Sequence, residues 1–146
     1  MPLATTTATT SRGDVPVSVH DESHCRAVKD PEVSATIAQM LARVGDKWSM
    51  LMVRTLGHGP VRFNELRRQI GDISQKVLSS TLKALERDGL VARTVVPSMP
   101  PQVSYELTDL GRELLIPVVA IIAWTIENTD RIVAARLAYD TQHANA

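Results

Sequence analysis

The chain of 146 residues has little of what several broad classes of function require. A single cysteine excludes an internal disulfide, and no cysteine or histidine spacing typical of a metal site occurs. The longest apolar run near the C-terminus, residues 114–124, is too short to cross a bilayer and is interrupted by Pro117. Since the N-terminus also lacks the basic start and apolar core of a signal peptide, we expect a cytoplasmic protein without a membrane span.

Catalysis is not indicated by any group of residues. A Ser–His–Asp or Cys–His arrangement, a phosphate-binding loop and a metal cluster are all missing from the sequence. The four histidines fall in predicted tail or loop positions: His20, His24, His58 and His143. We therefore expect a protein that is not an enzyme and that needs neither a cofactor nor a metal.

The composition is that of one globular domain, and its charges are unevenly distributed along the chain. Hydrophobic residues make up 44% and charged residues 22%, which are ordinary values for such a domain. Net charge is zero, but residues 43–93 hold ten Lys or Arg and five Asp or Glu, a net +5, so the remainder carries −5. This asymmetry predicts a basic working face on an acidic body, although chance segregation of solvated charges would give the same totals.

The two ends of the chain differ in composition from its middle. Thr, Ala and Ser dominate the first 22 residues, which have too few large apolar groups to repay ordering. Asp30-Pro31 predicts the start of a helix reaching about Arg43. Residues 47–56 predict a second helix, with an inward face formed by Trp48, Leu51, Met52, Thr55 and Leu56. The expected divisions are a disordered tail, a folded domain with dimerisation helices, and a C-terminal helix with a tail, at residues 1–22, 23–126 and 127–146.

Residues 62–89 predict two short amphipathic helices joined by a tight turn. Gly71-Asp72 supplies the turn, Ser74 is a good N-cap for the second helix, and Gly89 is a natural residue to end it. Apolar residues recur at helical spacing in both helices: Phe63, Leu66 and Ile70 in the first, and Leu78, Leu82 and Leu85 in the second. The pattern is typical of a helix–turn–helix.

The segment after Gly89 predicts a hairpin and then a long helix. Leu90–Val96 and Val103–Leu107 have strand composition, and the proline-rich link between them is too irregular to pair. Thr108 caps a final helix that is apolar on more than one face, which usually means packing against something beyond the domain. The predicted fold is mainly α with a small β-hairpin, a winged helix–turn–helix.

The helix after Ser74 has the chemistry of a DNA-reading element. In a helix–turn–helix the second helix enters the major groove. With the leucines inward, its outward residues are polar or cationic and include no carboxylate: Ser74, Gln75, Lys76, Ser79, Ser80 and Lys83. Flanking candidates for phosphate contacts are Arg62, Asn64, Arg67, Arg68 and Arg93. The plain alternatives are a solvated helix face and, for Arg67, a pair with a local carboxylate.

Five ordered and correctly spaced segments carry a family resemblance: Gly45–Trp48, Gly59–Leu66, Ile73–Leu78, Leu85–Arg93 and Tyr105–Arg112. Across roughly residues 31–124 the chain strongly resembles the HxlR-type transcriptional regulators, relatives of the MarR group. The resemblance implies a homodimeric winged-helix protein that dimerises through its terminal helices and binds a pseudo-palindromic operator in double-stranded DNA. We predict a sequence-specific repressor. The alternative is a winged-helix module for protein–protein contacts, against which the polar outward face argues.

The signal that relieves repression is predicted to be an oxidant or electrophile, or a small molecule. Several HxlR-type proteins sense oxidants through an N-terminal cysteine, and the matching region here is near Ala35, whereas Cys25 lies further upstream. His24 and Arg26 flank Cys25 and would favour a reactive thiolate if they stay close; otherwise Cys25 is a lone cysteine on a mobile segment. The candidate effector pocket consists of residues that at helical spacing more often form plain core: Met40, Trp48, Met52 and Trp124.

Overall fold

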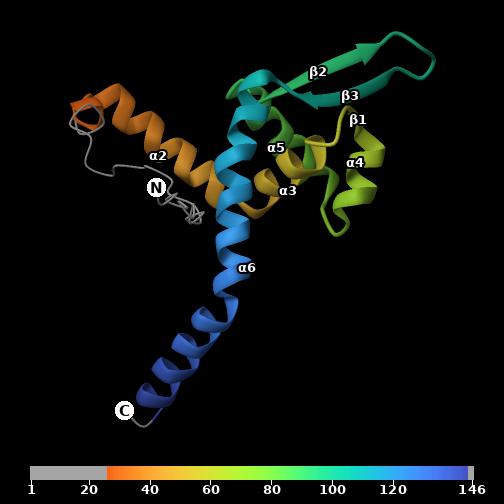
Figure 1. Ribbon diagram of the computed structural model, residues 1–146. Helices are drawn as coiled ribbons and strands as arrows, with labels where there is room; N and C mark the ends of the chain where they lie inside the picture. The colour runs from red at the N-terminus through yellow and green to blue at the C-terminus, as the bar shows by residue number, and fades with distance from the viewer. Residues whose placement is uncertain (1–25, 145–146) are drawn as a thin grey trace, which may run out of the picture. The chain divides into compact units, whose positions relative to one another are not determined.

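The computed structural model describes residues 26–144, and the chain divides into two units, Met1–Gln39 and Met40–Ala146. Along the chain lie α2 (Pro31–Gly45), α3 (Lys47–Leu56), β1 (Val61–Arg62), α4 (Phe63–Ile70), α5 (Gln75–Arg87), β2 (Val91–Val96), β3 (Gln102–Leu107) and α6 (Asp109–His143) (Figure 1). In the first unit, the Asp30 carboxylate accepts hydrogen bonds from the backbone N–H groups of Glu32 (2.9 Å) and Val33 (3.4 Å). The predicted helix start at Asp30-Pro31 is confirmed.

Side-chain caps and one left-handed glycine fix the ends of the helices in the second unit. Asp46 begins α3 by accepting hydrogen bonds from the backbone N–H (3.1 Å) and the hydroxyl (2.6 Å) of Ser49. The Ser74 hydroxyl caps α5 by accepting from the N–H of Val77 at 3.1 Å. Gly89, with φ of 76°, ends α5 in a Schellman turn in which the Leu90 N–H donates to the Leu85 carbonyl. The predicted helix–turn–helix is confirmed.

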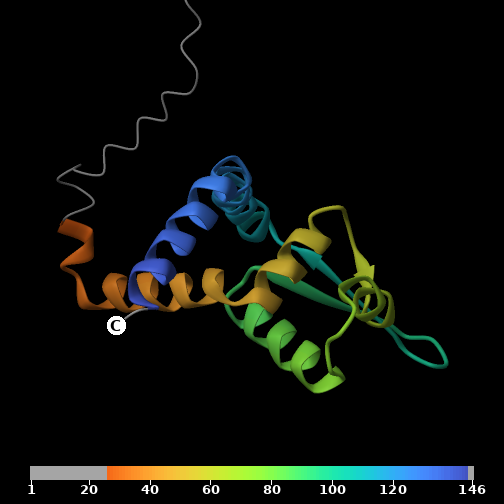
Figure 2. The same ribbon diagram turned by 90° about the horizontal axis from the view of Figure 1, so that it is seen from below.

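The sheet has one strand more than the predicted hairpin. Its order is β1–β3–β2, all antiparallel, with Arg93 and Val61 both opposite Tyr105. The sequence prediction missed β1 because two residues are too few to show an alternating pattern. Beyond the core, β2 and β3 continue as a hairpin that projects past α4 and α5 (Figures 1 and 2). This projecting hairpin is the wing.

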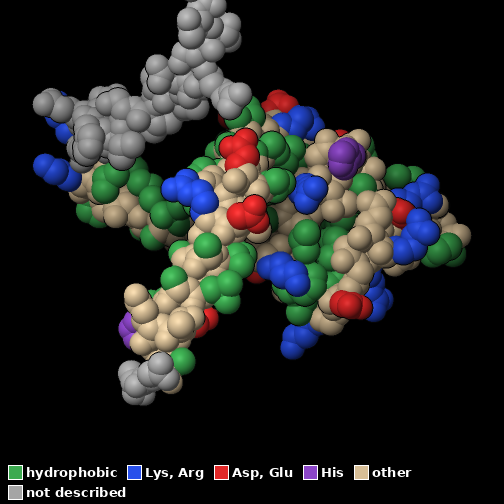
Figure 3. Space-filling view, turned by 60° about the horizontal axis from the view of Figure 1, so that its bottom comes forward, with side chains coloured by type: hydrophobic (Ala, Val, Ile, Leu, Met, Phe, Trp, Pro, Cys, Tyr) green, Lys and Arg blue, Asp and Glu red, His purple; other side chains and the backbone are tan. Residues whose placement is uncertain are grey.

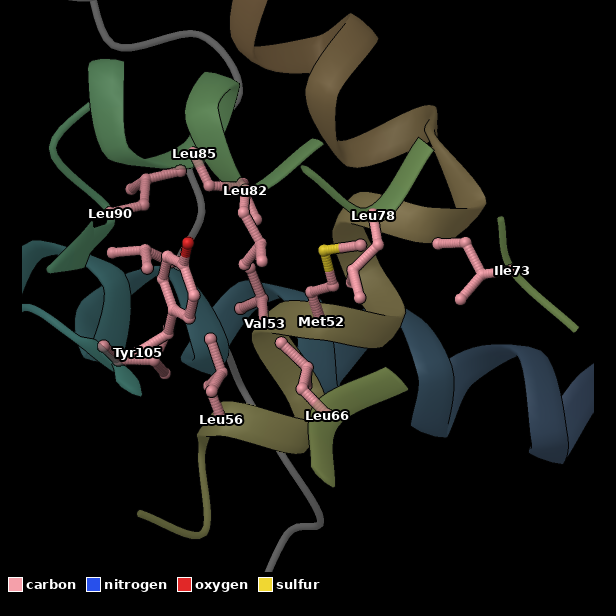
Figure 4. Close-up of a cluster of buried hydrophobic side chains, with 12 residues drawn as sticks. Met52, Val53, Leu56, Leu66, Ile73, Leu78, Leu82, Leu85, Leu90 and Tyr105 are labelled. Carbon is pink, nitrogen blue, oxygen red and sulfur yellow. The ribbon is translucent and has the colours of Figure 1, made fainter. Parts of the chain in front are cut away.

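One hydrophobic core joins α3, α4, α5 and the sheet (Figure 4). The predicted leucine stripe of α5 is its centre, because Leu78, Leu82 and Leu85 are at most 1% exposed. The predicted inward set of α3 was partly wrong: Met52 and Leu56 are buried and Trp48 packs against the core, but Leu51 and Thr55 are only half-buried. The helix is rotated so that Ser49 and Val53 face inward instead. Ser49 tolerates burial because its hydroxyl donates to Asp46.

The start of α6 is fastened to the end of α5. The Thr108 side chain caps α6 through the N–H of Gly111 and donates to the Gly89 carbonyl. Gly111 is required there, since a Cβ would collide with the Leu90 carbonyl oxygen. From Asp109 to His143 the helix is continuous, so the predicted boundary after residue 126 lies within it. Within residues 26–144, no helical segment has both the length and the apolar character needed to cross a bilayer.

Candidate nucleic-acid interface

The outward face of α5 is a polar surface without carboxylates over its first nine residues. Ser74, Gln75, Lys76, Ser80 and Lys83 are exposed, and Ser79 is half-buried. All of these predicted contact residues therefore lie where a ligand can reach them. The buried leucines on the opposite side hold α5 in the core, which leaves this face for an external partner.

Most cations of the site form no ion pair with a carboxylate of the described residues. Among the described residues, three ion pairs occur: Arg43–Asp88, Glu65–Arg68 and Asp109–Arg112. Of the predicted DNA-contact cations, Arg68 is in one of these pairs, and the others are in none of them: Arg62, Arg67, Lys76, Lys83 and Arg93. The alternative expected for Arg67 was an ion pair with a local carboxylate. The nearby carboxylate of Glu65 pairs with Arg68 instead. Unpaired cations attract phosphates without first having to break a bond.

Glu65 is the carboxylate closest in sequence to the predicted phosphate contacts of α4. The Arg68 guanidinium donates to it at 2.7 Å and the Gln69 amide at 2.9 Å. These hydrogen bonds, with that from Arg68 contributing most, lower the pKa of Glu65 below its usual 4.5 and raise the pKa of Arg68. Glu65 is therefore fully ionised at neutral pH, and Arg68 compensates its charge.

Two grooves separate the wing from the helix–turn–helix. The residues that line one of them, of about 620 Å³, include Arg62, Phe63, Asn64, Glu65, Arg93, Gln102 and Tyr105. The other, of about 470 Å³, lies against α5 and is lined by Ser79, Lys83, Glu86, Arg93 and Tyr105. Both contain predicted contact residues, and Arg93 borders both. Each groove has two cations and one carboxylate, so its lining is polar with a net positive charge, which suits a DNA backbone.

Residues of β3 were missed by the sequence reasoning. Gln102 and Tyr105 line the grooves although neither was expected at the site. The signal that could have found Tyr105 is the hairpin register, which sets it opposite Arg93. That register depends on the length of the proline-rich loop, which composition does not fix.

The proposed sensing residues lie elsewhere. Cys25 is outside the described residues. Met52 is fully buried, and Met40 and Trp48 are partly buried against the same core. Trp124 is 58% exposed on α6, where it borders a groove of about 270 Å³ lined only by other residues of that helix. The structure thus places three of the four predicted pocket residues in or against the core and does not bring Trp124 to them.

Comparison with known proteins agrees with this arrangement. A family model described as HxlR-like helix-turn-helix matches residues 43–133. An uncharacterised HTH-type transcriptional regulator of Halalkalibacterium halodurans is 46% identical over 89 residues, which is 60% of this chain and 79% of the relative. The solved structure of a transcriptional regulator, YtfH from Salmonella typhimurium, has 37% identity and a TM-score of 0.61, covering 68% of this chain and 88% of that one.

A further solved structure, the redox regulator HypR in its reduced form, has 35% identity and a TM-score of 0.63 over 68% of this chain and 98% of that one. Fold, exposed recognition face and wing define a transcriptional regulator of the winged helix–turn–helix class. The chain belongs to the HxlR-like helix-turn-helix family.

Proposed function

We propose that this regulator is a homodimeric repressor that binds a specific pseudo-palindromic operator. One observation carries the proposal: the exposed face of α5 presents Gln75, Lys76, Ser80 and Lys83 with no carboxylate among them. Glutamine pairs with adenine and lysine with guanine in the major groove, while serine reaches bases or phosphates. Arg62, Asn64, Arg67 and Arg93 contact flanking phosphates and so fix the register of α5 on the duplex.

The exposed apolar side chains of α6 support dimerisation. Within this 35-residue helix only Gly111 and Val118 are buried, while Ile116, Trp124, Ile126 and Leu137 are each more than half exposed. Figure 3 shows apolar side chains along α6, and Lys and Arg side chains over the part formed by α4, α5 and the wing. Burying the apolar side chains against a second copy separates the dimer contact from the DNA contact. A two-fold dimer then presents two α5 helices to half-sites about one helical turn apart.

The test is binding to duplexes from the intergenic DNA upstream of the gene, measured by fluorescence anisotropy over a series of salt concentrations. Specific binding should exceed binding to a scrambled duplex at least a thousand-fold or so, and its logarithm should fall linearly with the logarithm of salt concentration. Equal affinity for both duplexes would refute sequence specificity. Absence of any salt-dependent binding would favour the alternative, a winged-helix module that binds protein.

We further propose that an oxidant, an electrophile or a small molecule relieves repression. The structural similarity to a protein named as a redox regulator supports the redox form, and Cys25 is the only cysteine available for it. Peroxide or a quinone should release the wild-type protein from its operator, whereas Cys25→Ser should remain bound. If Cys25→Ser still responds, Cys25 is not the sensor, and the small-molecule signal is favoured.

A further inference from the structure

Tyr105 is a buried tyrosine whose hydroxyl has no protein partner. The residue is 8% exposed, and its ring packs in the core and against Phe63, with ring centroids 6.4 Å apart. Among the described residues its hydroxyl makes no hydrogen bond, yet every described side-chain nitrogen or oxygen fully shielded from solvent has a partner. The hydroxyl must therefore reach a surface. With no partner inside the protein, this hydroxyl is free to donate to a group that approaches from outside.

Tyr105 lines both grooves, and the position of its oxygen on the side of α5 points to the groove between α5 and the wing. In Figure 4 the Tyr105 ring lies beneath α5, with its oxygen directed toward Leu82, Leu85 and Leu90. Tyr105 lines the 470 Å³ groove together with residues that α5 presents toward the wing. Ser79, Lys83 and Glu86 stand at i, i+4 and i+7 of α5, so they share one side of the helix.

Arg93 completes the groove from the wing. It is the direct cross-strand partner of Tyr105, so both side chains lie on the same face of the sheet. Lys83 and Arg93 thus contribute two positive charges from two different elements, above a neutral hydroxyl donor. Neither cation has an ion-pair partner among the described residues. Two cations and a neutral donor around one space suit a monoanionic oxyanion.

Glu86 decides where in the groove the anion can lie. It is the one carboxylate among the residues that line this groove, and it stands one turn beyond Lys83 toward the C-terminal end of α5. Like charges repel, so the anion is held away from Glu86, between Lys83 and Arg93. An anion held at one position would fix how its molecule is aligned on α5, in addition to being attracted by the two cations.

We propose that the Tyr105 hydroxyl donates a hydrogen bond to one backbone phosphate of the DNA, held between Lys83 of α5 and Arg93 of the wing. This inference rests on the proposed DNA-binding function and adds to it a residue and a single phosphate. The wing and the recognition helix then hold the same phosphodiester from two sides. Tyr105 links that contact directly to the hydrophobic core.

Tyr105→Phe tests the proposal because it removes only the hydroxyl. Operator affinity should fall about ten-fold, the loss expected for one hydrogen bond to a charged group. The salt dependence should stay unchanged, since a neutral donor releases no counterion, whereas Lys83→Ala should reduce the slope by about one. Tyr139→Phe is the matched control, because the only other tyrosine is exposed on α6. An unchanged affinity of Tyr105→Phe would overturn the proposal.

A duplex series with single neutral methylphosphonates then separates a direct contact from a structural effect. At one phosphate per half-site, neutralisation should abolish the difference between wild type and Tyr105→Phe, while at the others the ten-fold difference should persist. A difference that persists at every position would show that the hydroxyl acts indirectly. A wild-type protein that binds no duplex would refute the proposed function itself, a result distinct from either.

Two further measurements keep the proposal falsifiable if Tyr105→Phe folds poorly. Protein labelled with 3-fluorotyrosine should give two fluorine resonances, and operator DNA should shift the Tyr105 signal and leave the Tyr139 signal in place. Glu86→Gln should tighten operator binding several-fold by removing the repulsion of the phosphate. No shift of the Tyr105 signal, or weaker binding by Glu86→Gln, would contradict the assignment.

Discussion

The helix–turn–helix with its wing and the C-terminal part of α6 are built on opposite principles. In the first region most large apolar residues, such as Leu66, Leu78 and Leu107, are buried, and the exposed ones are few and lie mainly on the wing. In α6 beyond Val118 the apolar side chains are themselves exposed. The first region is complete as a folded unit, while the second leaves apolar area in water that a partner can cover. The contrast is the one expected of a chain that, as we propose, binds nucleic acid and a second copy of itself through separate surfaces.

The largest effect, on the free energy of unfolding, should come from creating a cavity in the core of the helix–turn–helix region. Leu78→Ala removes a fully buried side chain and should lower the free energy of unfolding by about 2–5 kcal/mol at every protein concentration. Leu137→Ala, at a position 63% exposed, is the matched substitution in α6, and its effect should depend on protein concentration because it acts on association. Urea unfolding at several concentrations measures both. Equal, concentration-independent losses would remove the contrast.

Placing a charge on the apolar surface of α6 should have the next largest effect. Ile126→Glu sets a carboxylate where we propose a second copy packs, and it should weaken the dimer about a hundred-fold or more, since burying an unpaired charge is costly. Sedimentation velocity measures this as a shift to monomer. Met99→Glu at the exposed wing tip is the control and should leave the dimer intact. A dimer unaffected by Ile126→Glu would place the interface elsewhere.

How far the sequence predicted each region follows from what each region contacts. Helix periodicity, caps and glycines located α3, α4 and α5 because those signals are local, and the Ser74 cap and Gly89 turn were confirmed. Strand β1 was missed because Val61–Arg62 pairs with β3 only through a contact distant in sequence. The same reason hid Tyr105: its place in the groove follows from the register with Arg93, a tertiary property.

The helix α3 shows a different limit. Hydrophobic spacing alone predicted Leu51 inward, but the buried side includes Ser49, whose hydroxyl donates to Asp46. A pattern that counts only apolar residues does not detect a polar residue made compatible with burial by a cap. For the candidate interface the prediction needed no tertiary information. Exposed cations need no partner within the chain, so their pattern along α5 predicts their exposure, which the structure confirms. Their contact with DNA stays a prediction.

Removing one positive charge from α5 or from α6 should have a smaller effect, seen in operator binding. Lys76→Ala, on the outward face of α5, should weaken operator binding several-fold and reduce the salt slope by about one. Arg131→Ala, on exposed α6, removes the same charge from the other surface and should leave the slope unchanged. Anisotropy titrations between about 50 and 200 mM salt resolve a change of one unit. An equal reduction in both variants would mean that overall charge, and not the α5 surface, governs binding.

The smallest effect should come from the Glu65–Arg68 pair, which lies on the DNA-facing region but is engaged within its own helix. The pKa of Glu65 is lowered in the folded state, chiefly by the hydrogen bond from Arg68. The pair therefore stabilises the fold at pH values above 4.5, the pKa of Glu65 in the unfolded chain, and this stability is lost as the pH falls through the lower folded-state pKa. Arg68→Met should raise the pKa of Glu65 toward 4.5 in an NMR titration, and the small difference in Tm from wild type should vanish in acid. Because both groups are exposed, that difference should be close to the limit of measurement even at neutral pH.

Arg68→Met should also change the salt slope of operator binding less than Lys76→Ala does, since Glu65 already compensates the charge of Arg68. A full unit of slope lost with Arg68 would show that DNA displaces Glu65 from this pair.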